Sequence, residues 1–164
     1  MNKLNDLIDS KPAHYEAART KWQSMHNRVA KDPNYSHITI CDEWYTLSNF
    51  YNWFITQPNN HWQLDKDIKG GNEYSPEYCI FVPSEVNMLF RNVKTSLMKG
   101  VVRNCDGYQA QGNFGAGIKK FGTYSTVEEA HGVYIEKRKD YLYELSVKYT
   151  NSGELSAILL NLSK

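Results

Sequence analysis

The chain has 164 residues, a formal net charge of +1 at pH 7 and 13% aromatic residues. The length fits one domain or two small ones, and the near-neutral charge does not by itself indicate a nucleic-acid partner. We expect a soluble cytoplasmic protein without membrane contact, because no apolar run could cross a bilayer and the N-terminus lacks an apolar signal core.

Three cysteines lie far apart in the sequence, at Cys41, Cys79 and Cys105. An odd number without a Cys-x-x-Cys pair argues against a disulfide framework and against a zinc site. Cys41 and Cys79 lie in apolar runs, which favours buried thiols.

The first half of the chain predicts helices around one short strand. Residues 1–12 are expected to be a frayed start. A helix over 13–30 is predicted because apolar residues recur at three- and four-residue steps, namely Tyr15, Ala18, Trp22, Met25 and Val29. Its polar face, open to water or phosphate, would carry Arg19, Lys21, His26 and Arg28. Alternation predicts a strand over 36–41, and Asp42 is expected to cap a helix over 43–57.

In the stretch 64–87, polar residues lie where an apolar segment gives way to a loop and where a strand is followed by a helix. An acid–Lys–acid cluster, 65–67, follows a short apolar segment, and a Gly- and Pro-containing loop leads to a strand over 79–82. A helix then begins near Ser84 and carries Asn87 in its first turn, continuing to about Val93. This order could bring two ligands to one metal ion, or it could form a small structural module.

The second half predicts a sheet packed on a helix, giving an α+β fold. Strands are expected over 100–103, 108–114 and 118–124, separated by glycine-containing turns. Ser125 would cap a long helix, with Glu128 completing a capping box. A short C-terminal helix follows over 155–162. The apolar stripe of the long helix must pack against one face of the sheet, so we expect the other face to be free.

Alternation in the second strand separates two faces. Gln109, Gln111 and Asn113 point one way, and such amides can pair with adenine. Cations that could hold phosphates lie nearby, at Lys99, Arg103, Lys119 and Lys120. The alternative is a solvated face without a partner.

Part of this region resembles the Apetala-type (ethylene-response-factor) DNA-binding domain. The resemblance covers about 98–149 and rests on Lys99-Gly-Val, Gly107-Tyr108-Gln-Ala110, Phe121-Gly122-Thr123-Tyr124 and Thr126-Val-Glu128-Glu129-Ala130 with Tyr134. It implies a domain over 98–164 whose three-stranded sheet lies in the major groove of double-stranded DNA. By position, the DNA-facing residues would be Lys99, Val102, Asn104, Gln111, Asn113, Ile118 and Lys120. Several arginines and tryptophans of the plant domains are replaced, so their target sequence does not carry over.

The preceding part, 1–94, resembles phage-encoded HNH (His-Me finger) endonuclease homologues. The similar segments are Trp22-x-x-Met25-x-x-Arg28, Cys41-Asp-Glu-Trp44, Phe50-Tyr-x-Trp53, Leu64-Asp-Lys-Asp67 and Tyr74-Ser-Pro-Glu-x-Cys79-x-Phe-Val82. The resemblance implies a ββα unit in which Asp65 and Asn87 hold Mg²⁺ or Mn²⁺. Lys66 occupies the position of the catalytic histidine, and His61 could supply a base from the preceding loop.

Together the resemblances imply a sequence-preferring endonuclease that nicks or cuts duplex DNA with a divalent metal, located in the bacterial cytoplasm if phage-encoded. The alternative is a catalytically inactive DNA-binding regulator, or a phage protein that acts on a host or phage protein partner. A protein-binding module without DNA contacts is the third hypothesis.

Overall fold

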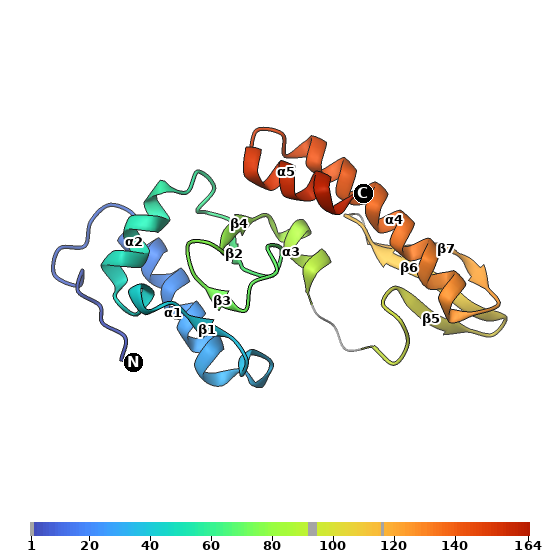
Figure 1. The fold of residues 1–164 in the computed structure, drawn as a ribbon, viewed down its shortest axis with the longest axis horizontal. Coiled ribbons are helices and arrows are strands. Elements are labelled where there is room, and N and C mark those ends of the chain that lie inside the picture. The colour runs from blue at the N-terminus through green and yellow to red at the C-terminus, as the bar shows by residue number, and fades with distance from the viewer. Residues whose placement is uncertain (1, 92–94, 116) are drawn as a thin grey trace. The chain divides into compact units, whose positions relative to one another are not determined.

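The computed structural model describes residues 2–91, 95–115 and 117–164, and the fold is α+β as predicted (Figure 1). The chain divides into two compact units, Met1–Phe90 (unit 1) and Arg91–Lys164 (unit 2). Each unit is considered by itself. In the described part of the chain, no helix is long and apolar enough to cross a membrane.

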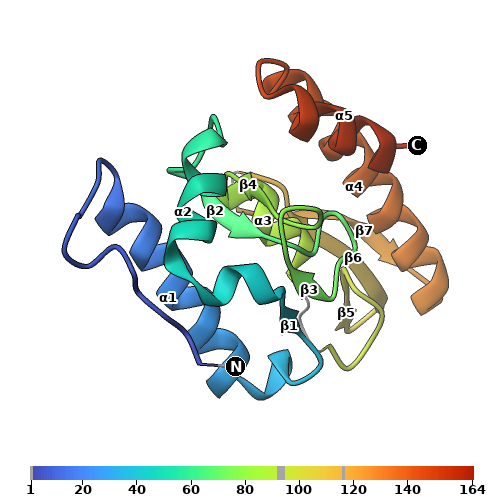
Figure 2. The same ribbon diagram turned by 60° about the vertical axis from the view of Figure 1, so that its left-hand side comes forward.

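The described residues of unit 1 form three α-helices and two 3-10 helices. In chain order these are α1 Tyr15–Lys31, η1 Pro33–Tyr35, η2 Asp42–Tyr45, α2 Leu47–Thr56 and α3 Ser84–Phe90. The first predicted helix is confirmed by α1, which lies beside α2 (Figure 2). The predicted end of the last helix near Val93 falls outside the described residues.

Unit 1 also contains two small pairs of strands. The strands are β1 Thr39–Ile40, β2 Gln63–Asp65, β3 Glu73–Tyr74 and β4 Ile80–Val82. β1 pairs with β3 in parallel, and β2 pairs with β4 in antiparallel orientation, with Asp65 opposite Ile80. The predicted strand over 36–41 is reduced to two residues because turn hydrogen bonding continues to Ile38, whose N–H donates to the Tyr35 carbonyl.

The predicted single helix over 43–57 is wrong. η2 and α2 are separate because Thr46 between them has extended backbone angles, with φ −103° and ψ 126°. Asp42 is the first residue of η2 and does not cap α2. The interruption leaves the backbone around Thr46 available to another segment.

That segment is the N-terminus, so the expected frayed start is also wrong. The Leu4 N–H donates to the Tyr45 carbonyl at 2.8 Å, and the Leu47 N–H donates to the Leu4 carbonyl at 2.9 Å. The Asp6 carboxylate accepts a hydrogen bond from the Ser48 N–H at 2.9 Å, which is the interaction an N-terminal cap provides. The cap of α2 therefore comes from a residue distant in sequence.

Aromatic packing forms the core of unit 1. Trp44 is 1% exposed and contacts Phe50 edge-to-face, with ring centroids 4.9 Å apart. Its carbonyl accepts hydrogen bonds from Trp22 Nε1 at 2.6 Å and from His26 Nε2 at 3.1 Å. The expectation that His26 faces water or phosphate is wrong, since this carbonyl partner allows the ring to be buried. Burial lowers the pKa of His26, although the bond to Trp44 opposes the shift.

Unit 2 is a three-stranded antiparallel sheet covered on one face by a long helix. Its elements are β5 Val101–Asn104, β6 Gly107–Asn113, β7 Ile118–Tyr124, α4 Val127–Lys148 and α5 Gly153–Leu162. The strand order is β5-β6-β7, and α5 folds back along α4 (Figure 1). The predicted strands and both helices of this half are confirmed within two residues at most ends.

The cap of α4 lies one residue later than predicted. The Thr126 hydroxyl accepts from the Glu129 N–H, and the Glu129 carboxylate accepts from the Thr126 N–H, both at 3.2 Å. Ser125 and Glu128 offer the same chemistry, so local propensity does not decide between the two positions. In the observed register, Ala130 is completely buried against the sheet.

A β-bulge sets the faces of β7. Ala110 pairs with Gly122, but Gln111 pairs with Lys120, so Phe121 is the extra residue. A bulge of this kind places two successive residues opposite one residue of the partner strand. On both sides of the bulge, the side chains of β7 therefore point to the same face of the sheet as the β6 side chains with which they pair.

Candidate nucleic-acid interface

The strand register defines the uncovered face of the sheet. Residues that pair directly on neighbouring antiparallel strands point to the same face. Gln109 pairs with Val102 on one side and with Thr123 on the other. The face so defined, called the open face below, is formed by Val102, Asn104, Gln109, Gln111, Asn113, Ile118, Lys120 and Thr123.

The opposite face packs on α4. Ala110 is fully buried there with Val101 and Ala130. Tyr108 and Tyr124 pair with each other across the strands and pack against this cluster. The expectation that α4 covers one sheet face is therefore confirmed, and no described element of unit 2 covers the other face.

Four of the sequence-predicted DNA contacts come together on the open face. Gln109, Gln111 and Asn113 alternate along β6, and Lys120 pairs with Gln111. Within the described residues, the three amide side chains make no intramolecular hydrogen bond; Asn113 is exposed, and Gln109 and Gln111 are half-buried. Three further positions implied by the family resemblance also lie on this face: Val102, Asn104 and Ile118.

Two open-face residues form a side-chain hydrogen bond to each other. Asn104 Nδ2 donates to Thr123 Oγ1 at 3.4 Å, while Asn104 Oδ1 accepts from the Cys105 N–H at 2.7 Å. Thr123 was not among the predicted site residues, because the bulge that returns it to this face leaves no mark in a simple alternating pattern.

The register does not bring Arg103 and Lys119 to the open face. Arg103 pairs with Tyr108; its Nη1 donates to the phenol oxygen at 3.2 Å, and the guanidinium lies 5.5 Å from the ring centroid. Lys119 pairs with Gly112, whose position in β6 belongs to the α4 side. These cations are exposed, but on the other side of the sheet from Lys120.

Lys99 lies beside α4. Its carbonyl accepts a hydrogen bond from His131 Nδ1 at 2.8 Å, and its ammonium donates to the Arg91 carbonyl at 3.4 Å. Burial, together with the charge of Arg138, lowers the pKa of Lys99. Lys99 is therefore not grouped with the open-face amides.

The chemistry of the open face suits base edges. A carboxamide presents a donor and an acceptor side by side, and Gln and Asn form bidentate pairs with adenine in the major groove. That groove is wide enough to admit β-strands. An ammonium group such as that of Lys120 can neutralise a phosphate.

In unit 1, Asp65 is buried and already engaged. It is 5% exposed, and its Oδ1 accepts a hydrogen bond from the Ile68 N–H at 2.9 Å. Burial raises the pKa of Asp65, against the opposing effect of this hydrogen bond. The carboxylate closes the turn that follows β2. As held here, Asp65 does not fit the role of a metal ligand, because a divalent cation needs an accessible oxygen and this side chain is buried and hydrogen-bonded.

Lys66 is buried among aromatic rings. It is 3% exposed, and its ammonium donates to Asp67 Oδ1 at 2.5 Å. The same nitrogen lies 5.6 Å from the Tyr35 ring centroid and 5.8 Å from that of Tyr74. The Lys66 ammonium is therefore occupied by a carboxylate partner and lies close to two aromatic rings. Sequence reasoning missed the two tyrosines, which come from distant segments.

The other predicted nuclease residues lie in separate surroundings. Asn87 Nδ2 donates to Gln63 Oε1 at 2.5 Å, which joins α3 to the first residue of β2. Asp65 is at the other end of the same strand, about 7 Å away along the chain at the usual rise per residue. His61 is exposed, with its ring 5.6 Å from that of Trp62.

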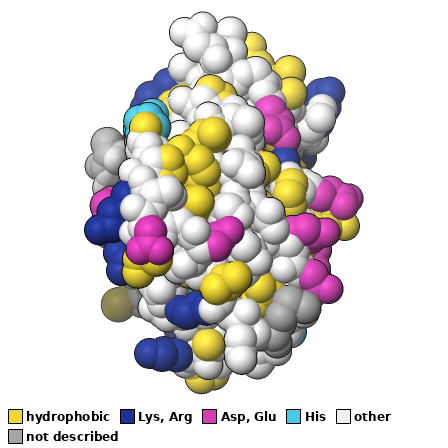
Figure 3. Space-filling view, turned by 90° about the vertical axis from the view of Figure 1, so that its left-hand side faces the viewer, with side chains coloured by type: hydrophobic (Ala, Val, Ile, Leu, Met, Phe, Trp, Pro, Cys, Tyr) yellow, Lys and Arg dark blue, Asp and Glu magenta, His cyan; other side chains and the backbone are white. Residues whose placement is uncertain are grey.

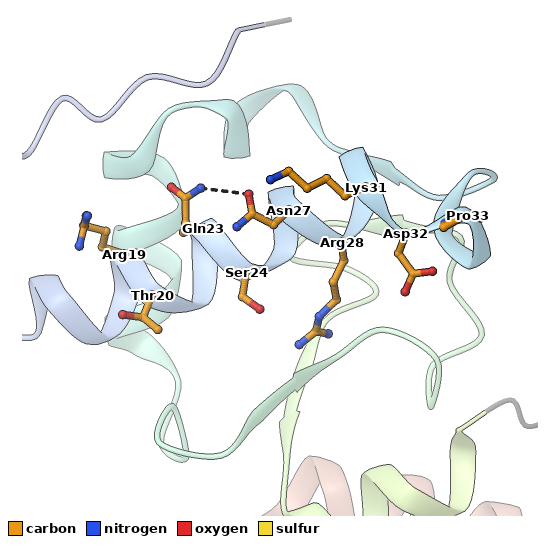
Figure 4. Close-up of a pocket in the computed structure, with 9 residues that line it drawn as sticks. All are labelled: Arg19, Thr20, Gln23, Ser24, Asn27, Arg28, Lys31, Asp32 and Pro33. Carbon is orange, nitrogen blue, oxygen red and sulfur yellow. Dashed lines mark hydrogen bonds between the residues drawn. The ribbon is translucent and has the colours of Figure 1, made fainter.

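A hollow of about 690 Å³ lies along α1 (Figure 4). Its lining residues are Arg19, Thr20, Gln23, Ser24, Asn27, Arg28, Lys31, Asp32 and Pro33. Arg28 points away from the helix axis (Figure 4) and interacts with the phenol groups of Tyr74 and Tyr35. It therefore links α1 to the tyrosines that surround Lys66.

The face in Figure 3 carries charged side chains of both signs with small apolar groups among them.

Comparison with family models, curated proteins and solved structures gave no significant match to this chain.

Proposed function

We propose that the chain is a sequence-preferring DNA-binding protein that holds duplex DNA with the open face of unit 2 and does not cut it. The observation that supports this best is the strand register. It gathers Gln109, Gln111 and Asn113 with Lys120 on the one sheet face that α4 leaves uncovered.

The buried site of unit 1 supports the part of the proposal that concerns cleavage. A hydrolytic nuclease needs a group that accepts a proton from water. Lys66 is buried and bound to Asp67 beside two tyrosine rings, and Asp65 is buried and engaged by a backbone N–H, so neither group is open to an attacking water molecule. Both groups have structural tasks that explain their burial.

The proposal predicts that two neighbouring lysines differ in their effect on binding. Lys120→Ala removes a cation from the open face, so we expect affinity for a duplex to fall about 3- to 10-fold and the salt slope to decrease by about 1. Lys119→Ala is the matched control, since it changes an exposed lysine on the opposite face of the same strand. We expect less than about a 2-fold change for it. Fluorescence anisotropy over a range of salt concentrations measures both, and equal losses would contradict the orientation.

A DNA endonuclease is the second candidate function. The observation in its favour is that β2, β4 and α3 follow one another as strand, strand and helix, with Asp65 at one end of β2 and Asn87 bound to the other end. For Asp65 to contact a metal, its carboxylate would have to leave the Ile68 N–H.

Incubation with supercoiled plasmid and Mg²⁺ or Mn²⁺ separates the two candidates. The non-cleaving proposal predicts no metal-dependent nicking by the wild-type protein under conditions in which it binds the plasmid. Nicking that is lost in both Asp65→Ala and Asn87→Ala would establish the endonuclease instead. Nicking that persists in both variants would contradict the site at β2 and α3.

A further inference from the structure

We infer that the open face prefers A·T-rich DNA and recognises thymine through its methyl group. This inference rests on the proposed function, because it concerns the same face and the same partner. It follows from which side chains the register places there and from which it excludes.

The polar groups of the open face match adenine better than guanine. Guanine is read most often by arginine or lysine, and adenine by asparagine or glutamine. Among the described residues of the open face there are four amide side chains, one lysine and no arginine. Arg103, the arginine of this sheet, is turned to the other side by its pairing with Tyr108.

Two exposed apolar side chains on the open face could contact the thymine methyl group. Ile118, the first residue of β7, is 67% exposed, and Val102 in β5 is 37% exposed. Apolar groups placed in the major groove contact the C5-methyl group of thymine. A partner that carries methyl groups and covers the open face would explain why these two apolar side chains are exposed.

Each apolar residue is the direct neighbour of an amide. Ile118 pairs with Asn113, and Val102 pairs with Gln109. Directly paired side chains in antiparallel strands have Cβ atoms about 5 Å apart. An A·T pair offers the adenine N6 and N7 groups and the thymine methyl group on one major-groove edge. The amide and apolar neighbours are therefore arranged to contact both features of that edge together.

Binding to three duplexes of equal length tests the inference at one salt concentration. The first has an A·T-rich core, the second a G·C-rich core, and the third is the first with every thymine replaced by uracil. Uracil keeps the hydrogen-bonding groups and lacks only the methyl. We expect at least about 10-fold preference for the A·T-rich duplex over the G·C-rich one, and about 4-fold loss for each buried methyl removed.

Variants assign the methyl effect to the open face. Ile118→Ala should bind the thymine and uracil duplexes with more similar affinity than the wild-type protein does. Val147→Ala, which removes an exposed apolar side chain from α4, should keep the full difference. Failure to bind any of the duplexes would overturn the proposed function itself. Binding without preference, with G·C preference, or with no response to uracil would overturn only this inference.

Discussion

Gly100→Ala is expected to lower the free energy of unfolding of unit 2 by about 3 kcal/mol or more. Gly100 has φ +81°, and a Cβ atom there would lie 2.1 Å from the Tyr134 ring. That ring is 5% exposed and stacks on Phe114, so it cannot move aside cheaply. The Gly100 carbonyl also accepts a hydrogen bond from the Gln111 N–H at 2.8 Å, so displacing it would disturb the open face.

Gly117→Ala separates the steric clash from backbone strain. Gly117 has φ +93°, but a Cβ atom there would meet nothing within 4 Å. We expect this control to cost only about 1 kcal/mol. Urea unfolding followed by far-UV circular dichroism measures both variants. All four tryptophans lie in unit 1, namely Trp22, Trp44, Trp53 and Trp62. The urea transition seen by tryptophan fluorescence should therefore be the same in both variants as in the wild-type protein. Equal costs for the two glycines would contradict the packing described.

Lys66→Ala is expected to destabilise unit 1 by about 2–4 kcal/mol, because it empties a buried space and breaks an ion pair. The Lys66 side chain is 4% exposed, whereas its partner Asp67 is 49% exposed. After substitution, Asp67 could be solvated by water, so most of the cost should come from the lost aliphatic stem and its contacts with Tyr35 and Tyr74.

Lys66→Met is the matched variant for that explanation. Methionine restores most of the buried volume without the charge, and we expect it to lie within about 1 kcal/mol of the wild-type protein. Tryptophan fluorescence during urea unfolding reports the stability of unit 1 directly. An alanine variant as stable as the wild-type protein would show that Lys66 has no structural role and would strengthen the endonuclease candidate.

The sheet and long helix of unit 2 could be predicted because their signals are local. Alternation along 108–113 and the Asp-Gly turn define the central strand, and the apolar stripe of α4 defines the covered face. What could not be predicted depends on tertiary packing. The bulge at Phe121 returns Thr123 to the open face, and Thr126 rather than Ser125 caps α4.

Buried polar residues of unit 1 were harder to foresee because their partners are distant in sequence. The buried His26 ring is hydrogen-bonded to the Trp44 carbonyl, and the buried Lys66 ammonium lies beside the rings of Tyr35 and Tyr74. The N-terminal segment was expected to fray because its pairing with η2 and α2 involves backbone groups, which the sequence does not distinguish. The residues of the candidate nuclease site were identifiable, but their hydrogen bonds were not.

Side-chain amide resonances of the open face test the central claim most directly. In a nitrogen–proton correlation spectrum, each Gln and Asn NH₂ group gives its own pair of signals. Upon titration with an A·T-rich duplex, we predict that the pairs from Gln109, Gln111 and Asn113 shift, while those from Asn49 and Asn161 stay in place. Bound protein in which the open-face amide signals remain unchanged would contradict the account.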